Sequence, residues 1–170
     1  VAPELTRHAV FTTVLGIGER SGNAPMEEIV MALKTMYGVD VGIDCTKLTP
    51  LANLVQRLTG VVVPTNKAIV GSGLYQIESG IIASWFKNCG EKNATELFPI
   101  RWSAVGQPPA EVVMGKGSGI DSVNMWLKDV GMQVSEEDAM KVLQAVKLHS
   151  LNNKKMLSHA EFRDVARATL

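Results

Sequence analysis

The residues best suited to chemistry lie in one polar cluster, Gly16-Ile17-Gly18-Glu19-Arg20-Ser21-Gly22-Asn23. Glycines allow a backbone to approach a ligand closely, and a carboxylate, a guanidinium and an amide stand among them. The spacing fits neither a dinucleotide-binding fingerprint nor a phosphate loop that ends in Lys-Ser/Thr. A plain turn explains the same residues, with Asn23 as a helix cap and Glu19 and Arg20 as a surface pair. The residues alone leave both interpretations open.

The histidines and cysteines form no familiar site. His8, His149 and His159 have no His-x-His or His-x-x-x-His relation, so they predict no complete metal site. Cys45 and Cys89 make no Cys-x-x-Cys, which argues against a zinc knuckle or a disulfide framework. No Gly-x-Ser-x-Gly occurs either. Two isolated cysteines favour a reducing compartment, and we expect a cytoplasmic protein.

Local patterns place the polar cluster between a strand and a helix. Residues 10–15 are short and rich in β-branched side chains, and glycines close them, which predicts a buried strand. After the cluster, Pro25 suits a first helical turn, and apolar residues recur at helical spacing from 26 to 37, before Gly38. A turn that follows a strand is where α/β proteins bind ligands.

The rest of the chain reads as mainly helical. A second helix is predicted over residues 47–59, with Pro50 in its first turn and Gly60 as terminator. Glycines and prolines interrupt residues 61–109, where one helix is predicted at about 74–87. The last third predicts a small bundle of three helices: an apolar stripe over 123–130, a helix that Ser135 opens with Met140, Leu143 and Val146 inward, and a capping box of Ser158 and Glu161.

Composition narrows the class of partner. The 170 residues are 46% hydrophobic and carry 17 basic and 17 acidic side chains, as in a soluble globular protein. A net charge of zero argues against binding to nucleic acid or to an anionic membrane surface. No apolar run approaches the roughly 20 residues that cross a bilayer. We therefore expect no nucleic-acid and no membrane partner.

Three segments resemble a known enzyme family. Residues 16–34 and residues 64–73 (Pro-Thr-Asn-Lys-Ala-Ile-Val-Gly-Ser-Gly) resemble the end of the catalytic barrel, and the segment after it, in the 2-isopropylmalate synthase and homocitrate synthase family. Residues 115–119, Gly-Lys-Gly-Ser-Gly, are similar to the Gly-Lys-His-Ser-Gly that opens the family's small helical subdomain. Order and spacing agree, so the resemblance covers nearly the whole chain, as a C-terminal segment.

The resemblance implies a fold in three parts. Residues 1–60 would be the last strand-helix units of an α/β TIM barrel, residues 61–110 a connector or subdomain I, and residues 111–170 a small three-helix subdomain II. The segment would be predominantly α. In the family the connector crosses onto the neighbouring subunit, so we expect a homodimer through residues 61–110. Leu74, Ile77, Ile81, Trp85 and Phe86 would form a helical stripe for that partner, or pack within the chain.

The resemblance also implies a divalent-metal-dependent acyltransferase that condenses acetyl-CoA with a 2-oxo acid. In the family, Mg²⁺, Mn²⁺ or Zn²⁺ is held by an Asp, a His-x-His pair and the Asn that closes Gly-Glu-Arg-x-Gly-Asn. Only Asn23 matches, within a turn that contains Gly18, Glu19, Arg20 and Gly22. We expect the other ligands upstream of Val1, and therefore an isolated segment that is inactive and binds the ion weakly. The metal would act as a Lewis acid on the 2-oxo acid.

Several family positions are not matched. After Ser-Gly-Ile the family commonly carries a His that reaches the active site, and this chain has Ile82. The His of the third motif is Gly117, the Asn before Gly-Ile-Gly is Leu15, and no Tyr occurs over residues 93–97. The catalytic acid and base are therefore unassigned. Two alternatives stay open: a related lyase that cleaves a 3-hydroxyacyl-CoA, like 3-hydroxy-3-methylglutaryl-CoA lyase, and a non-catalytic interaction segment.

Overall fold

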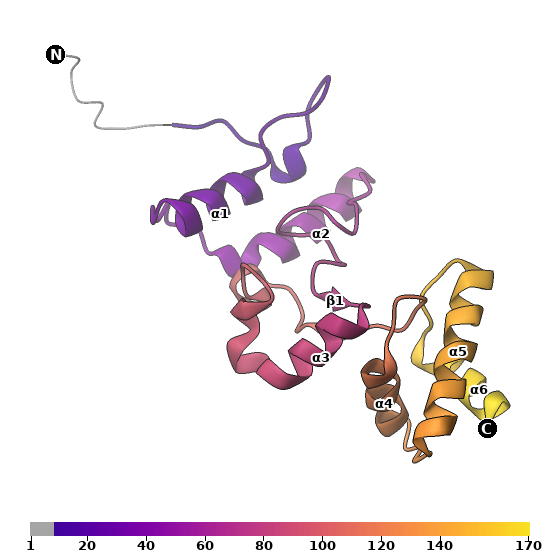
Figure 1. Cartoon of the computed structure of the whole chain (residues 1–170). Coiled ribbons are helices and arrows are strands. Elements are labelled where there is room, and N and C mark those ends of the chain that lie inside the picture. Colours follow the sequence, from indigo (N-terminus) through magenta and orange to yellow (C-terminus); the bar gives the residue numbers. More distant parts are fainter. Residues whose placement is uncertain (1–8) are drawn as a thin grey trace. The chain divides into compact units, whose positions relative to one another are not determined.

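The computed structural model describes residues 9–170 and is mostly helical, as expected (Figure 1). Its α-helices are α1 (Met26–Met36), α2 (Leu48–Thr59), α3 (Gly80–Cys89), α4 (Ile120–Asp129), α5 (Glu136–Asn153) and α6 (His159–Thr169). Short 3₁₀ turns are η1 (Val14–Gly16), η2 (Cys45–Lys47), η3 (Glu91–Glu96) and η4 (Trp102–Val105). Strands β1 (Gln76–Ile77) and β2 (Glu111–Val112) pair in parallel, Gln76 with Glu111 and Ile77 with Val112.

The residues gather in two compact units. Among the described residues, unit 1 contains those up to Leu74 together with Trp102–Pro108, and unit 2 contains Tyr75–Arg101 and Pro109–Leu170. The segment Trp102–Pro108 thus returns to unit 1 after the chain has entered unit 2. The predicted three-part division at residues 60 and 110 stays a prediction.

Unit 1 is built on α1, α2 and the returning turn η4. Helix α2 begins at Leu48, has Pro50 in its first turn and ends at Gly60 in the left-handed conformation (φ 74°), as predicted. The Thr49 hydroxyl donates a hydrogen bond to the Val105 carbonyl (2.7 Å), which joins α2 to η4. The side chains that fill this unit are Val30, Met31, Cys45, Leu48, Ala52, Val70, Trp102 and Val105.

The predicted strand at residues 10–15 is wrong. Residues 9–12 have no regular structure, Phe11 is 90% exposed, and Thr13 makes only an isolated bridge with Pro25. Leu15 turns into the left-handed region (φ 62°) within η1. A β-branched run becomes a strand only where another strand pairs with its backbone, and no such neighbour lies beside it among residues 9–170.

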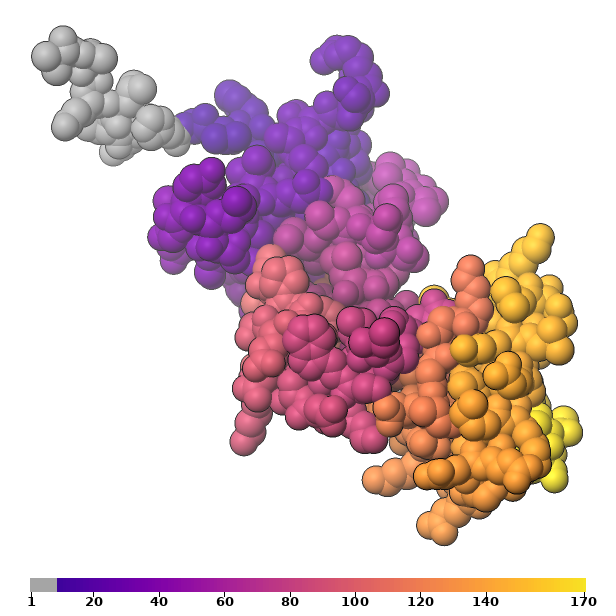
Figure 2. All heavy atoms as spheres, in the orientation of Figure 1, coloured from indigo at the N-terminus to yellow at the C-terminus, as the bar shows by residue number. Residues whose placement is uncertain are grey.

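Unit 2 has a hydrophobic core of its own. Side chains from α4, α5 and α6 share it, including Val123, Trp126, Val146 and Phe162. Figure 2 shows these orange and yellow segments as continuous packed atoms. The Trp126 indole N–H donates to the Val112 carbonyl (2.8 Å), and the Phe162 ring meets the indole edge-on at 5.3 Å. This anchors the bundle to β2.

The helix starts in this unit follow the predicted caps. The Ser135 hydroxyl accepts from the Asp138 N–H, and Ser158 and Glu161 form the complete capping box. Met140 was predicted to point inward, but it is 47% exposed. The buried stripe of α5 runs through Ala139, Val142, Leu143 and Val146, and Met140 lies about 100° around the helix from Ala139.

The helix predicted at residues 74–87 begins only at Gly80. Ile77 lies in β1 and is buried, whereas Ile81 on α3 is 81% exposed and Trp85 is 47% exposed. The five residues proposed as one partner-binding stripe therefore belong to different surfaces. Parallel pairing with β2 holds residues 76 and 77 extended, a non-local contact that local spacing could not reveal. No helix among the described residues is long and apolar enough to span a membrane.

Candidate functional site

The polar cluster forms a closed loop whose two ends are tied together. Thr13 N–H donates to the Ala24 carbonyl (3.1 Å), and Met26 N–H donates to the Thr13 carbonyl (2.9 Å). Across the loop, Asn23 N–H donates to the Gly16 carbonyl (2.8 Å). The limbs approach so closely that a Cβ on Gly22 would lie 2.4 Å from the Gly16 oxygen. Gly16 and Gly22 therefore allow the two limbs of the loop to approach each other this closely.

The side chains that the sequence singled out lie at the exposed tip of this loop. Glu19 and Arg20 form a surface ion pair at 3.5 Å, with side chains 90% and 85% exposed. Such a pair contributes little to stability. Gly18, Gly22 and Asn23 are also exposed. The loop therefore presents its polar atoms to solvent, and the surface-pair interpretation of Glu19 and Arg20 is confirmed.

Asn23 does not cap the helix. The residue before α1 is Pro25, which makes no side-chain cap, and the Asn23 amide oxygen accepts from the adjacent Ala24 N–H (2.8 Å). That bond fixes the direction of the amide. A carbonyl oxygen has two lone pairs, so this oxygen can still donate one to a hard cation.

The residue that anchors the loop is Glu27, which the sequence analysis did not single out. It is 2% exposed, and its Oε2 accepts from the N–H of Leu15 (3.0 Å), the residue with φ 62°. Its Oε1 has no hydrogen-bond partner. A buried carboxylate with one free oxygen is costly unless a cation lies near.

The cation is Lys67, from the second motif. Its Nζ lies 3.7 Å from Glu27 Oε1 and forms a closer ion pair with Glu28. The Lys67 side chain is only 20% exposed. The motifs at residues 16–34 and 64–73 therefore meet through Lys67 and two neighbouring carboxylates. A signal was present in the sequence: Glu27 shares the i, i+3, i+4 spacing of buried Val30 and Met31.

The third motif meets a different segment, in unit 2. The Glu78 Oε1 accepts from the N–H of Gly117 (2.8 Å), and Gly80 N–H donates to the Gly117 carbonyl (3.3 Å). Gly80 and Gly119 are in such close contact that a Cβ on Gly80 would lie 2.7 Å from the Gly119 Cα. The Ser118 hydroxyl is buried and accepts from Gly115 N–H (2.9 Å).

No metal cluster is preformed in the part of the chain that the structure describes. No three His, Cys, Asp or Glu side chains gather among residues 9–170. His159 stacks on Trp126 with ring centroids 3.8 Å apart, and both cysteines are free thiols. His8 lies outside the described residues. Among residues 9–170, Asn23 therefore has no cluster of His, Cys, Asp or Glu side chains beside it.

Comparison with known proteins gives the family. The HMGL-like family model matches residues 7–55, which include the whole loop and α1. Homocitrate synthase 1 of a Nostoc species is 40% identical over 94% of this chain, and homocitrate synthase AksA of Methanopyrus kandleri is 40% identical over 86%. A 2-isopropylmalate synthase of Burkholderia vietnamiensis is 40% identical over 75%. The chain belongs to the 2-isopropylmalate and homocitrate synthase family.

The chain is much shorter than these members of the synthase family. It spans 41% of the Nostoc protein, 36% of the Methanopyrus protein and 25% of the Burkholderia protein. All three relatives carry the name of a synthase, so the lyase alternative is not favoured.

Two departures from the synthase-family pattern fall in neighbouring segments of unit 2. Gly117 lies on the loop that Glu78 and Gly80 hold, and Ile82 is on α3, where it packs against the small core of Ile77, Ala83 and Val112. Ile82 is therefore a packing residue in this chain. Neither position supplies a group that can transfer a proton.

Proposed function

We propose that this chain is part of a divalent-metal-dependent acyltransferase that condenses acetyl-CoA with a 2-oxo acid. The observation that carries the proposal is the Gly16–Asn23 loop of the synthase-family motif, which holds Asn23 exposed and oriented. Metal ions in active sites act best when their ligands are fixed before substrate arrives. Glu27 and Lys67 would hold this loop in place.

Asn23 fits one position in the ligand set of a hard divalent cation, Mg²⁺ or Mn²⁺, or of Zn²⁺. Its neutral amide oxygen would leave the charge of the ion available to a 2-oxo acid, and the ion would polarise the keto group as a Lewis acid. The other ligands would come from residues upstream of Val1. We accordingly expect isothermal calorimetry with Mn²⁺ to detect no tight site on the 170-residue chain. A stoichiometric micromolar site would contradict this ligand assignment.

The fold would then be completed by a TIM barrel. In that arrangement residues 10–15, which have no strand partner among residues 9–170, would pair with a neighbouring barrel strand. The Gly16–Asn23 loop would then follow the carboxyl end of a barrel strand, where barrel enzymes place their catalytic groups. Residues 111–170 would form the small helical subdomain, and residues 61–110 the connector through which two copies associate. The exposed apolar side chains of α3 support the dimer.

The test is condensation activity in the full-length protein. Thiol release from acetyl-CoA should require a divalent ion and a 2-oxo acid. Asn23→Ala should raise the metal concentration for half-maximal rate about tenfold or more, the cost typical of disturbing a metal site. Asn53→Ala, on the exposed face of α2, is the matched control and should leave it unchanged. Absence of thiol release with every 2-oxo acid tried would refute the proposal.

A further inference from the structure

A second polar cavity lies in unit 2, away from the Asn23 loop in sequence. It has a volume of about 350 Å³ and is lined by Glu78, Lys116, Leu151, Lys154, Lys155 and Met156. Lys116 comes from the Gly115–Gly119 loop, whereas the other two lysines follow the end of α5. Two segments that are distant in sequence therefore bring three ammonium groups to one hollow.

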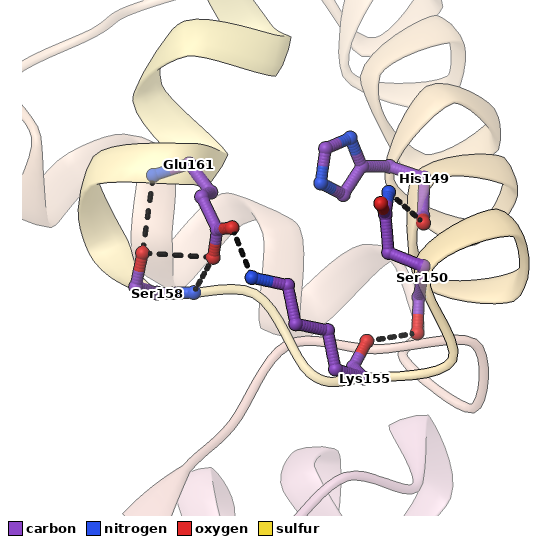
Figure 3. A network of polar contacts seen from close by, with 6 residues as sticks. His149, Ser150, Lys155, Ser158 and Glu161 are labelled. Atoms are coloured by element: carbon purple, nitrogen blue, oxygen red, sulfur yellow. Dashed lines mark hydrogen bonds and ion pairs between the residues drawn. The ribbon is translucent and has the colours of Figure 1, made fainter.

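Specific contacts hold these two segments together. Leu157 N–H donates to the Met114 carbonyl (2.8 Å), so the residue before the first turn and the residue after the second form an isolated antiparallel bridge. The buried Ser150 hydroxyl donates to the Lys155 carbonyl (2.8 Å; Figure 3). Lys154 takes the left-handed conformation (φ 51°) that turns the chain. The lysine-bearing turns thus have defined backbones.

The positive charge in the cavity is only partly balanced by the residues that the structure describes. Lys155 pairs with Glu161, as Figure 3 shows. Within residues 9–170, neither Lys116 nor Lys154 forms an ion pair. The carboxylate of Glu78 is already engaged by the Gly117 N–H. Lysines at the end of α5 also favour its helix dipole, but that does not explain Lys116, which another segment brings.

The chemistry of the walls points to an anion with an apolar part. Lys116 and Lys154 can hold phosphate oxygens, and the side chains of Leu151 and Met156, 56% and 46% exposed, offer an apolar face for a planar base. A cavity of about 350 Å³ is at the small end of the range for ligand sites, which suits the end of a longer molecule.

We propose that this lysine cavity binds the phosphorylated nucleotide end of coenzyme A. The assignment rests on the proposed function, which makes an acyl-CoA the substrate. The phosphates would lie against Lys116 and Lys154, and the adenine would cover Leu151 and Met156. The lysines of this cavity recognise clustered phosphates. Inorganic pyrophosphate also carries clustered phosphates, so an experiment must distinguish it from the nucleotide.

The experiment is titration calorimetry on the 170-residue chain without metal or 2-oxo acid. Coenzyme A and adenosine 3′,5′-bisphosphate should bind, and pantetheine, which lacks the nucleotide, should not. Lys116→Ala/Lys154→Ala should weaken binding about tenfold or more, since two cations in contact with the phosphates are lost. The matched control is Lys92→Ala/Lys128→Ala, which removes two exposed lysines elsewhere in unit 2.

A variant that removes the charge of Glu78 provides a further test of the proposal. Glu78→Gln keeps an oxygen for the Gly117 N–H and removes the one negative charge of the cavity, so nucleotide binding should tighten. Binding that the control pair weakens as much as the cavity pair, or no binding at all, would overturn the proposal. Equal affinity for pyrophosphate and coenzyme A would overturn the nucleotide assignment. These outcomes are independent of condensation activity, so failure here and failure of the proposed function are distinguishable.

Discussion

At the scale of single residues, Glu27 shows how one buried carboxylate can fix a loop. One oxygen holds the N–H of Leu15 in its left-handed conformation, and the other faces Lys67. The exposed Glu19 and Arg20 attract attention in the sequence but contact mainly each other. The buried Glu27 therefore matters more to the loop than the exposed Glu19–Arg20 pair, because a charge interaction removed from water is screened less.

Removing the cation beside Glu27 should be costly. Lys67→Met leaves a carboxylate that is 2% exposed without its charged neighbour, and we expect the free energy of unfolding of unit 1 to fall by about 3 kcal/mol. Hydrogen exchange of the loop amides, Leu15 in particular, should accelerate. Arg57→Met removes an exposed cation on α2 and should change stability by less than about 0.5 kcal/mol. Equal effects of the two variants would show that the buried pair does not hold the loop.

Glu161 makes the stability of unit 2 depend on pH in the acid range. Hydrogen bonds from Lys155, from the Ser158 N–H and from the Ser158 hydroxyl lower the pKa of Glu161 from its ordinary 4.5 to about 2. Because the folded pKa is the lower one, the stabilisation is complete above pH 4.5 and disappears as the pH falls to about 2.

Glu161→Gln tests this. The difference in unfolding free energy between wild type and variant should shrink as the pH is lowered from 4.5 to about 2. Glu96→Gln replaces an exposed glutamate of unit 2 that forms no ion pair among the described residues, and its difference from wild type should stay constant. Parallel curves for Glu161→Gln and wild type would contradict the role of this carboxylate.

At the scale of elements, loops from different parts of the chain depend on close backbone contacts. The start of α3 and the Gly115–Gly119 loop touch through Gly80 and Gly119, and the Gly117 carbonyl accepts from Gly80 N–H. The antiparallel bridge between Met114 and Leu157 holds this loop beside the turn that follows α5.

Gly80→Ala should disturb this contact. The added Cβ would lie 2.7 Å from the Gly119 Cα, so backbone must move, and we expect a loss of about 2 kcal/mol in denaturant unfolding of unit 2. Gly131→Ala is an informative comparison, because nothing lies within 4 Å of its added Cβ and only its positive φ (74°) is unfavourable. A loss of roughly 1 kcal/mol is expected there. If Gly80→Ala costs nothing, the close approach is not needed.

At the scale of the whole molecule, exposed apolar side chains on α3 support association of two copies. Ile81 is 81% exposed and Trp85 is 47% exposed, one helical turn apart. Burying such a pair in a dimer would be favourable in proportion to the apolar area covered. Residues 61–110 contain both, as the dimer proposal requires.

Sedimentation tests the dimer. The chain should be dimeric at micromolar concentration, and Ile81→Glu should shift it toward monomer by placing a charge in the interface. Lys92→Glu, also exposed and in residues 61–110, is the control for a charge change outside the α3 face. A monomeric wild-type chain at micromolar concentration would contradict the proposal.

Local sequence determined the features that depend on neighbouring residues. The end of α2 at Gly60, the caps of α5 and α6, and most of the buried stripe of α5 follow from side chains within a few positions of one another. The family motifs likewise pointed to the Gly16–Asn23 segment, because a motif is a continuous run of residues.

Only the tertiary structure decided the long-range contacts. Pairing of β1 with β2 shortened the predicted α3, and the absence of a neighbouring strand among the described residues left residues 9–12 irregular. The ion pair of Glu27 with Lys67, and the cavity that Lys116 shares with the turn after α5, bring together residues about 40 positions apart in each case. Whether such distant segments meet depends on the packing of the whole unit, so the spacing of residues along the chain cannot predict these contacts.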